Sequence, residues 1–165
     1  MLDEQVLIRA GCSLGVVAHC LAVSRTAVSL AERVKRVPID GELVRLGGLL
    51  HDIGRGRTHG LDHAIVGAAF GREMGFSPQL CAIIERHIGA GITAAEAERL
   101  GLPKKDYLPQ TPEEKIVSYA DNLTKGVEAM PIEQAVKRFI DILGPEHEGV
   151  RLLLRQHEEI QGWMT

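Results

Sequence analysis

The chain has 165 residues, of which 45% are hydrophobic and 25% charged, and its formal net charge is −3 at pH 7. These values are typical of one soluble globular domain spanning residues 1–165, and they exclude a disordered chain. The weak negative charge argues against a nucleic acid duplex as partner, because duplex binding requires clustered Lys and Arg.

Apolar residues spaced by three and four positions predict helices along nearly the whole chain, and no segment shows the alternation of a strand. Glycines at 11, 54 and 75 are expected helix ends, and residues 54–60 an irregular loop. Asp40, Ser77, Thr93 and Thr111 are expected N-caps, the last two in capping boxes with Glu96 and Glu114. The predicted helices cover roughly residues 3–10, 13–34, 40–54, 61–74 and 77–87, then segments starting near Thr93, Thr111, Pro131 and Pro145. We therefore expect an all-α fold of about seven to nine helices in one compact domain.

The cysteine pattern and the N-terminal residues indicate the cellular compartment in which the protein is expected. Met1–Gln5 contains two acids where a secretory signal carries Lys or Arg, and no run of 18 or more apolar residues occurs. The three cysteines form no CxxC pair, which is typical of reduced thiols buried as small hydrophobic side chains. We expect a cytoplasmic protein that does not cross a membrane.

The strongest chemical signal is the pair His51-Asp52, which a glycine follows two residues later. At a helix end, neighbouring imidazole and carboxylate groups can turn toward the same point, and this donor pair suits divalent Fe, Mn, Co, Ni or Zn. His19 and Asp121 lie beside apolar positions of their predicted helices, and a buried carboxylate requires a cation or several donors. Taken singly, each also fits a hydrogen-bonded core residue or an exposed cap.

Taken together, His19, His51-Asp52 and Asp121 resemble the HD superfamily of metal-dependent phosphohydrolases, and His51-Asp-Ile-Gly-Arg55 resembles its HDIG variant. The resemblance covers residues 13–125; the C-terminal helices expected over 131–163 carry no family motif. It implies an HD-type helical domain in which these four residues hold a metal ion, with Asp52 bridging through both carboxylate oxygens.

Two further segments, around His63 and His87, resemble the additional histidine motifs of two-metal HD proteins. By this resemblance His63 and His87 would complete a second metal site. The interval between Asp52 and His63 is short compared with many two-metal relatives, which leaves one ion and two ions both open.

The resemblance implies hydrolysis of a phosphate monoester, phosphodiester or phosphoanhydride of a nucleotide-like small molecule by metal-activated water. Asp52 and Arg55 are the expected catalytic residues. Arg55 and Arg57, just after the metal motif, are candidates to bind phosphate. His59 is either a wall of the pocket or a plain loop residue, and Lys125 either reaches the same anion or faces solvent.

Several features have simpler explanations. Gly47-Gly48 and Gly54/Gly56 lack the strand-then-helix setting of a phosphate loop, so close helix packing and turns explain them better. His147 and His157, in a charged C-terminal segment, are expected to be ordinary surface residues.

Two other functions remain open: a di-iron oxygenase built on the same ligand set, and a non-catalytic, metal-containing nucleotide-binding module. Whether the protein is a monomer or a homodimer is also open, because the apolar stripe over residues 150–154 fits either a partner or the core of the same chain.

Overall fold

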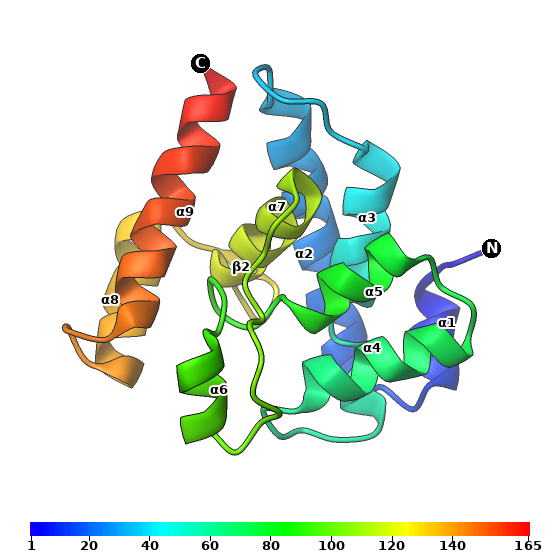
Figure 1. The fold of residues 1–165 in the computed structure, drawn as a ribbon. Helices are drawn as coiled ribbons and strands as arrows, with labels where there is room; N and C mark the ends of the chain where they lie inside the picture. Colours follow the sequence, from blue (N-terminus) through cyan, green and yellow to red (C-terminus); the bar gives the residue numbers. More distant parts are fainter.

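The computed structural model describes all of residues 1–165 and is built almost entirely from helices, so the prediction of an all-α fold is confirmed (Figure 1). Its elements are α1 (Glu4–Arg9), α2 (Leu14–Arg33), α3 (Gly41–Leu50), the 3₁₀ helix η1 (Ile53–Gly56), α4 (His63–Glu73), α5 (Pro78–Glu85), α6 (Ala94–Arg99), α7 (Pro112–Asn122), strands β1 (Thr124–Lys125) and β2 (Glu128–Ala129), α8 (Ile132–Leu143) and α9 (Glu148–Met164).

The small β1–β2 hairpin corrects the expectation that no strand is present. The strands pair antiparallel, with Thr124 opposite Ala129, and Gly126 in the turn has a φ of 62°. Each strand has two residues, which is too short for a recognisable alternating pattern.

Helix starts follow the capping signals of the sequence. The predicted capping box at Thr111 is complete, because Thr111 accepts the Glu114 N–H and the Glu114 carboxylate accepts the Thr111 N–H. The predicted box at Thr93 is only half formed: Thr93 accepts the Glu96 N–H, but the Glu96 carboxylate pairs with Arg99. Side chains also cap α2, α3 and α5, each accepting the N–H three residues later: Ser13, Asp40 and Ser77.

Helix ends depart from the prediction at two places that matter for the site. Helix α3 ends at Leu50 instead of at Gly54, and residues 53–56 form η1, which occupies the start of the irregular loop expected over residues 54–60. Helix α5 ends at Glu85, two residues before His87. His51 and His87 therefore both lie just beyond the end of a helix, where the last carbonyl groups have no backbone donor.

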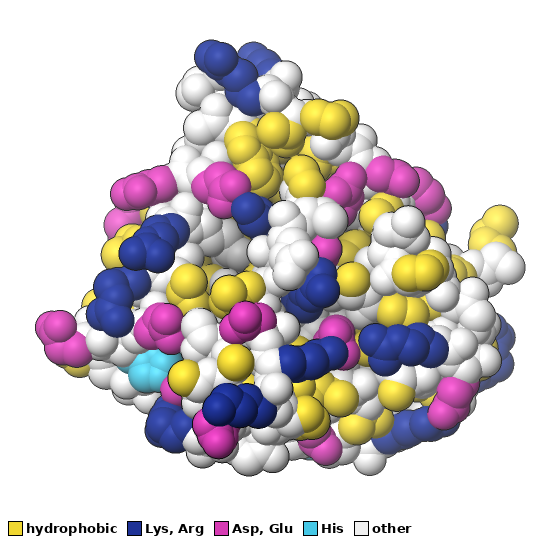
Figure 2. Space-filling view, viewed as in Figure 1, with side chains coloured by type: hydrophobic (Ala, Val, Ile, Leu, Met, Phe, Trp, Pro, Cys, Tyr) yellow, Lys and Arg dark blue, Asp and Glu magenta, His cyan; other side chains and the backbone are white.

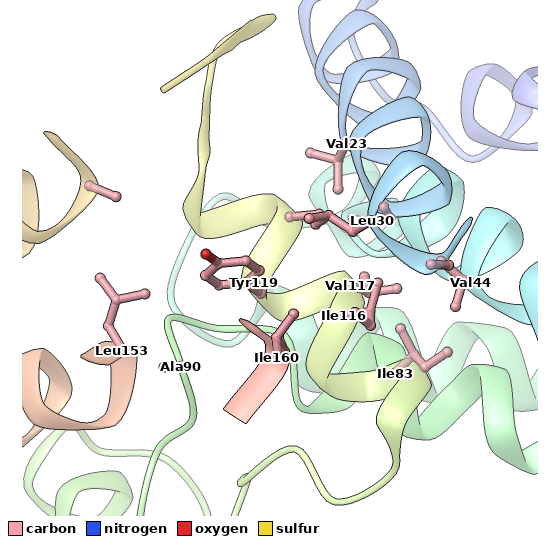
Figure 3. Packing of buried hydrophobic residues seen from close by; sticks show 14 residues of the cluster. Val23, Leu30, Val44, Ile83, Ala90, Ile116, Val117, Tyr119, Leu153 and Ile160 are labelled. Carbon is pink, nitrogen blue, oxygen red and sulfur yellow. The ribbon is translucent and has the colours of Figure 1, made fainter. Parts of the chain in front are cut away.

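One hydrophobic cluster joins α2 to α7 and α9. Figure 3 shows Val23 of α2, Ile116 and Tyr119 of α7, and Leu153 and Ile160 of α9 in this cluster, all of them buried. Helix α2 is long and apolar enough, by length and composition alone, to cross a membrane. In this structure its apolar residues pack against α3 and α7, and burial on several sides accounts for that composition.

A second cluster packs α1, α2 and α3 against α4 and α5. It contains the three cysteines, Cys12, Cys20 and Cys81, which are free and buried. The expectation that they serve as small hydrophobic side chains is confirmed.

Glycines allow two close backbone approaches. A Cβ on Gly48 would lie 2.7 Å from the Ser24 Cα, so α3 approaches α2 closely. A Cβ on Gly54 would overlap the His63 carbonyl oxygen and lie 2.7 Å from the Gly67 nitrogen. Close packing, as predicted, is therefore the role of these glycines, and it brings η1 against the start of α4.

Helices α8 and α9 form a hairpin at one edge of the molecule (Figure 1). A buried polar network attaches α9 to α7: the Gln156 amide donates to the Ser118 hydroxyl, and the Asn122 amide donates to the Gln156 Oε1. Val150 and Leu153 are buried within the chain. These two residues of the apolar stripe over 150–154 therefore contact the core of the same chain and not a partner.

Two histidines expected to be ordinary surface residues are instead partly buried and hydrogen-bonded. His147 caps α9 by accepting the Gly149 N–H, and its Nε2 lies 3.1 Å from the Glu96 carboxylate. His157 Nδ1 lies 2.6 Å from the Tyr119 hydroxyl. The mixed polar sequence of α9 concealed these contacts, because both partners come from distant segments.

Candidate metal centre

The structure brings six predicted ligands into one cluster where α2, the α3–η1 turn, α4, the end of α5 and α7 meet. Possible ligand atoms form three overlapping groups of three residues, and within each group these atoms lie within 4.8 Å of one another. The six residues are His19, His51, Asp52, His63, His87 and Asp121.

Three of the histidines are oriented by the same local device. His51, His63 and His87 each donate from Nδ1 to the carbonyl oxygen three residues earlier, at 2.7, 2.8 and 2.7 Å. A carbonyl oxygen only accepts, so Nδ1 carries the hydrogen and the neutral ring presents its lone pair at Nε2. Metal-binding histidines in proteins are oriented in this way.

His19 also has its Nδ1 hydrogen-bonded to a carbonyl oxygen, but this carbonyl belongs to a residue far away in the sequence. Its Nδ1 lies 2.6 Å from the carbonyl oxygen of Gly126, in the turn of the β1–β2 hairpin. The hairpin therefore orients His19. No local sequence signal indicates this contact, because the two residues are 107 positions apart.

Asp52 lies at the centre of the cluster, and its two carboxylate oxygens face different histidine pairs. Oδ1 is 3.1 Å from the Nε2 of His63 and 3.2 Å from that of His87. Oδ2 is 3.6 Å from the Nε2 of His51 and 3.8 Å from that of His19. One carboxylate thus connects two neighbouring sets of nitrogen donors, and the sets adjoin where His51 and His87 approach each other.

Asp121 belongs to the first of these sets. Its Oδ1 lies 3.0 Å from the His19 Nε2 and 3.5 Å from the His51 Nε2. The His51 Nε2 is buried and has no hydrogen-bond partner. Buried polar atoms without partners are rare, and a cation held between His51 and the two carboxylates would satisfy this one. The donor set therefore fits a divalent metal ion.

The second set has its own requirement for a positive charge. The Nε2 atoms of His63 and His87 lie 3.2 Å apart, and in both rings Nδ1 donates to a carbonyl group. Two lone pairs at this distance repel each other unless a proton or a metal ion lies between or beside them.

The ionisation of the ion-free cluster reflects the same charges. Burial opposes protonation of His51, but the carboxylates of Asp52 and Asp121 outweigh it and raise the pKa of His51 to about 9. Burial also opposes ionisation of both carboxyls, yet the His51 imidazolium and the hydrogen bonds from the other histidines hold their pKa values low. The two carboxylates thus favour a positive charge at His51, as they would favour a metal ion beside it.

Metal binding is therefore expected to release protons. At pH 7 His51 is protonated in the ion-free protein, and a metal ligand must be neutral, so apparent affinity for Mn²⁺ should rise up to pH 9, about tenfold per pH unit for one proton. Without metal, the folding stability changes with pH in the opposite direction. The raised pKa of His51 contributes its full stabilisation of the fold below 6.5, the ordinary pKa of histidine, and this contribution is lost as the pH rises through about 9.

Calorimetry of Mn²⁺ binding in buffers of different ionisation enthalpy measures the protons released. Binding with no proton release would contradict this assignment.

The cluster opens into a cleft of about 300 Å³. Arg55 lines this cleft, and its Nε lies 3.3 Å from the Asp52 Oδ2. Asn122 and Arg138 also line it, although neither was predicted. Asn122 directly follows Asp121 in the sequence, and this position could have indicated that it lines the cleft. Arg138 lies in α8, beyond every motif in the sequence.

Three predicted substrate residues do not line the cleft. The Arg57 guanidinium lies 4.3 Å from the centre of the Phe70 ring, and His59 is exposed in the segment before α4. Lys125 is exposed on β1. Of the two alternatives for Lys125, the structure agrees with the one in which it faces solvent, because α7 ends at Asn122 and does not carry Lys125 toward the cleft.

Comparison with known proteins agrees with this architecture. The HD domain family model matches residues 16–126. An uncharacterized protein of Methanocaldococcus jannaschii, MJ0778, is 54% identical over 151 residues, which cover 90% of this chain and 89% of that protein. A tRNA (cytidine(56)-2′-O)-methyltransferase of Picrophilus torridus is 39% identical over 145 residues, but these cover 88% of this chain and only 41% of the methyltransferase.

Among solved structures, the HD domain of the L. monocytogenes phosphodiesterase PgpH has a similar fold, with a TM-score of 0.56 and 17% identity, covering 96% of this chain and 97% of that one. The same domain has been solved in complex with cyclic-di-AMP. Family match, fold and the His-Asp cluster lead to one conclusion: this chain belongs to the HD domain family.

Proposed function

We propose that the protein is a metal-dependent phosphodiesterase acting on a small nucleotide-like substrate. The observation that supports this most directly is the position of Asp52, whose Oδ1 and Oδ2 face two different pairs of histidines. A carboxylate in that position suits two metal ions better than one.

The first ion would be held by His19, His51, Asp121 and the Oδ2 of Asp52. The second would be held by His63, His87 and the Oδ1 of Asp52. Imidazole and carboxylate donors suit Fe, Mn, Co, Ni and Zn, and they do not discriminate sharply among these metals.

Substrate binding follows from charge. Two divalent ions carry more positive charge than two carboxylates neutralise, so the cleft attracts a phosphate group. When bound, such ions lower the pKa of water and stabilise charge on phosphate oxygens. Arg55 is about one third exposed in the cleft, with a single ion-pair contact to Asp52. A phosphate oxygen can replace this contact, so Arg55 binds and orients the phosphate.

The proposal that the substrate is a phosphodiester rests on the structural similarity to PgpH. PgpH is described as a phosphodiesterase, and its HD domain binds cyclic-di-AMP. Charge also argues against a duplex substrate. In Figure 2, Lys and Arg side chains on the face shown are interspersed with Asp and Glu, without the continuous basic stripe of duplex-binding proteins.

The direct test combines metal analysis with turnover. Protein purified without chelators and protected from air should contain near two transition-metal ions per chain. It should also hydrolyse bis(p-nitrophenyl) phosphate and a linear dinucleotide in the absence of oxygen. A metal-loaded protein that releases product only while consuming oxygen would instead be an oxygenase. A loaded protein with no turnover of any phosphodiester would contradict the proposed activity.

The two-ion assignment predicts a specific loss in His87→Ala. This variant should retain the ion at His19, His51 and Asp121 and lose the other, because His87 contacts Asp52 only through Oδ1. Metal content by elemental analysis should fall from near two to near one per chain. His59→Ala, which removes an exposed histidine outside the cleft, is the control and should leave the content unchanged. Unchanged stoichiometry in His87→Ala would refute the second site.

A further inference from the structure

A second cavity, of about 440 Å³, adjoins the metal cleft and shares part of its wall. The shared residues come from the segment before α4, the segment after His87 and α8: Leu61, Ile88, Gly89, Arg138, Phe139 and Ile142. A ligand whose phosphate lies among the metal ligands can therefore extend directly into the second cavity.

The walls of this cavity are largely apolar. Beyond the shared residues, it is lined by Ile92, Leu100, Leu143 and Leu152, and its volume lies within the ordinary range of small-molecule pockets. Among the charged groups around it, the Glu96 carboxylate contacts both Arg99 and His147, and the Glu148 carboxylate accepts the Thr93 hydroxyl, so only Arg138 has no partner. Such a cavity suits a flat, mostly apolar group and not a second phosphate.

The mouth of the cavity exposes large apolar side chains. Ile142 is 70% exposed, Leu61 49% and Leu143 40%. Exposed apolar groups gathered at one place indicate a binding surface more often than chance. A ligand in the cavity would cover these three side chains and remove them from water.

Arg138 lies where the cavity and the cleft meet. It is partly buried and makes no ion pair or hydrogen bond within the chain, whereas Arg55 and Arg99 each contact a carboxylate. A partly buried guanidinium without a partner is ready to bind an anion, and its planar fork matches two phosphate oxygens.

We propose that this cavity binds the nucleobase and ribose of the substrate while Arg138 holds the phosphate at the junction. This inference rests on the proposed function and restricts its substrate class to nucleotides and dinucleotides, excluding small alkyl phosphates. The subsite depends on α8 and α9, which lie beyond residue 126, where the family match ends. The rest of its wall, including Leu61, Ile92 and Leu100, lies within the matched residues.

The test compares the binding of AMP and inorganic phosphate to Mn²⁺-loaded protein by calorimetry. AMP should bind at least about fivefold more tightly than phosphate, which corresponds to the low end of what stacking of one base contributes. Ile142→Asp should remove this advantage and leave phosphate affinity unchanged. Arg138→Gln should weaken AMP and phosphate alike, by about tenfold.

Matched controls lie on α8 and α9. Lys137→Gln changes the exposed cation next to Arg138, and Leu154→Asp changes an exposed apolar residue of α9 outside the cavity. Both should bind AMP as the wild type does, and thermal unfolding checks that all four variants fold.

The possible outcomes separate the two proposals. If phosphate does not bind to the loaded protein, the proposed function fails. If phosphate binds but AMP binds no more tightly, the nucleoside subsite is overturned and the proposed function stands. An AMP advantage that persists in Ile142→Asp, or an Arg138→Gln variant that binds both probes normally, also overturns the subsite.

Discussion

Asp52→Ala is expected to lose both metal binding and at least about 10³-fold of the phosphodiesterase activity, the loss that several kcal/mol of metal-derived stabilisation implies. Asp52 is the only carboxylate within ion-pair distance of the Nε2 atoms of His63 and His87. It also supplies one of the two carboxylates facing His19 and His51. Its removal leaves four imidazoles without their shared counter-charge, so neither set of donors retains a metal ion.

The measurement pairs elemental analysis with turnover of bis(p-nitrophenyl) phosphate. Asp141→Ala removes an exposed carboxylate of α8 that makes no contact with the cluster, and it should keep both metal and activity. Asp52→Asn preserves the size of the side chain, and thermal unfolding of this variant separates loss of metal from loss of fold. Full turnover by Asp52→Ala would rule out the proposed mechanism.

Gly54→Ala is expected to destabilise the protein by about 3 kcal/mol or more, at the upper end for a small-to-large change in a packed interior. The added Cβ would overlap the His63 carbonyl oxygen and lie 2.7 Å from the Gly67 nitrogen. Both neighbours are backbone atoms, so neither can rotate away and η1 must separate from α4. That separation would also move His63 away from Asp52.

Urea unfolding monitored by circular dichroism measures this effect. Gly162→Ala is the matched control, because Gly162 lies in α9 and a Cβ there meets no atom within 4 Å. The control should leave stability unchanged or raise it by up to about 1 kcal/mol, the helix propensity difference between Gly and Ala. Equal unfolding midpoints for Gly54→Ala and the wild type would contradict the close approach of η1 and α4.

The sequence by itself determined the features that depend on neighbouring residues. Helix caps at Asp40 and Thr111 and the three-to-four spacing of apolar residues predicted most elements, because both signals act within one or two helical turns. The six candidate ligands were identified through the order of a motif along the chain. Where helix α3 stopped early, after Leu50, the expected helix end at Gly54 was wrong, and η1 was not predicted.

Only the tertiary structure decided how these residues face one another. The contact between His19 and Gly126, and the division of the Asp52 oxygens between two histidine pairs, join segments far apart in the sequence. Arg138 and Asp52 line the same cleft although they are 86 positions apart in the sequence. Such contacts arise when several amphipathic helices bury their apolar faces together, and the packing of all of them sets the geometry.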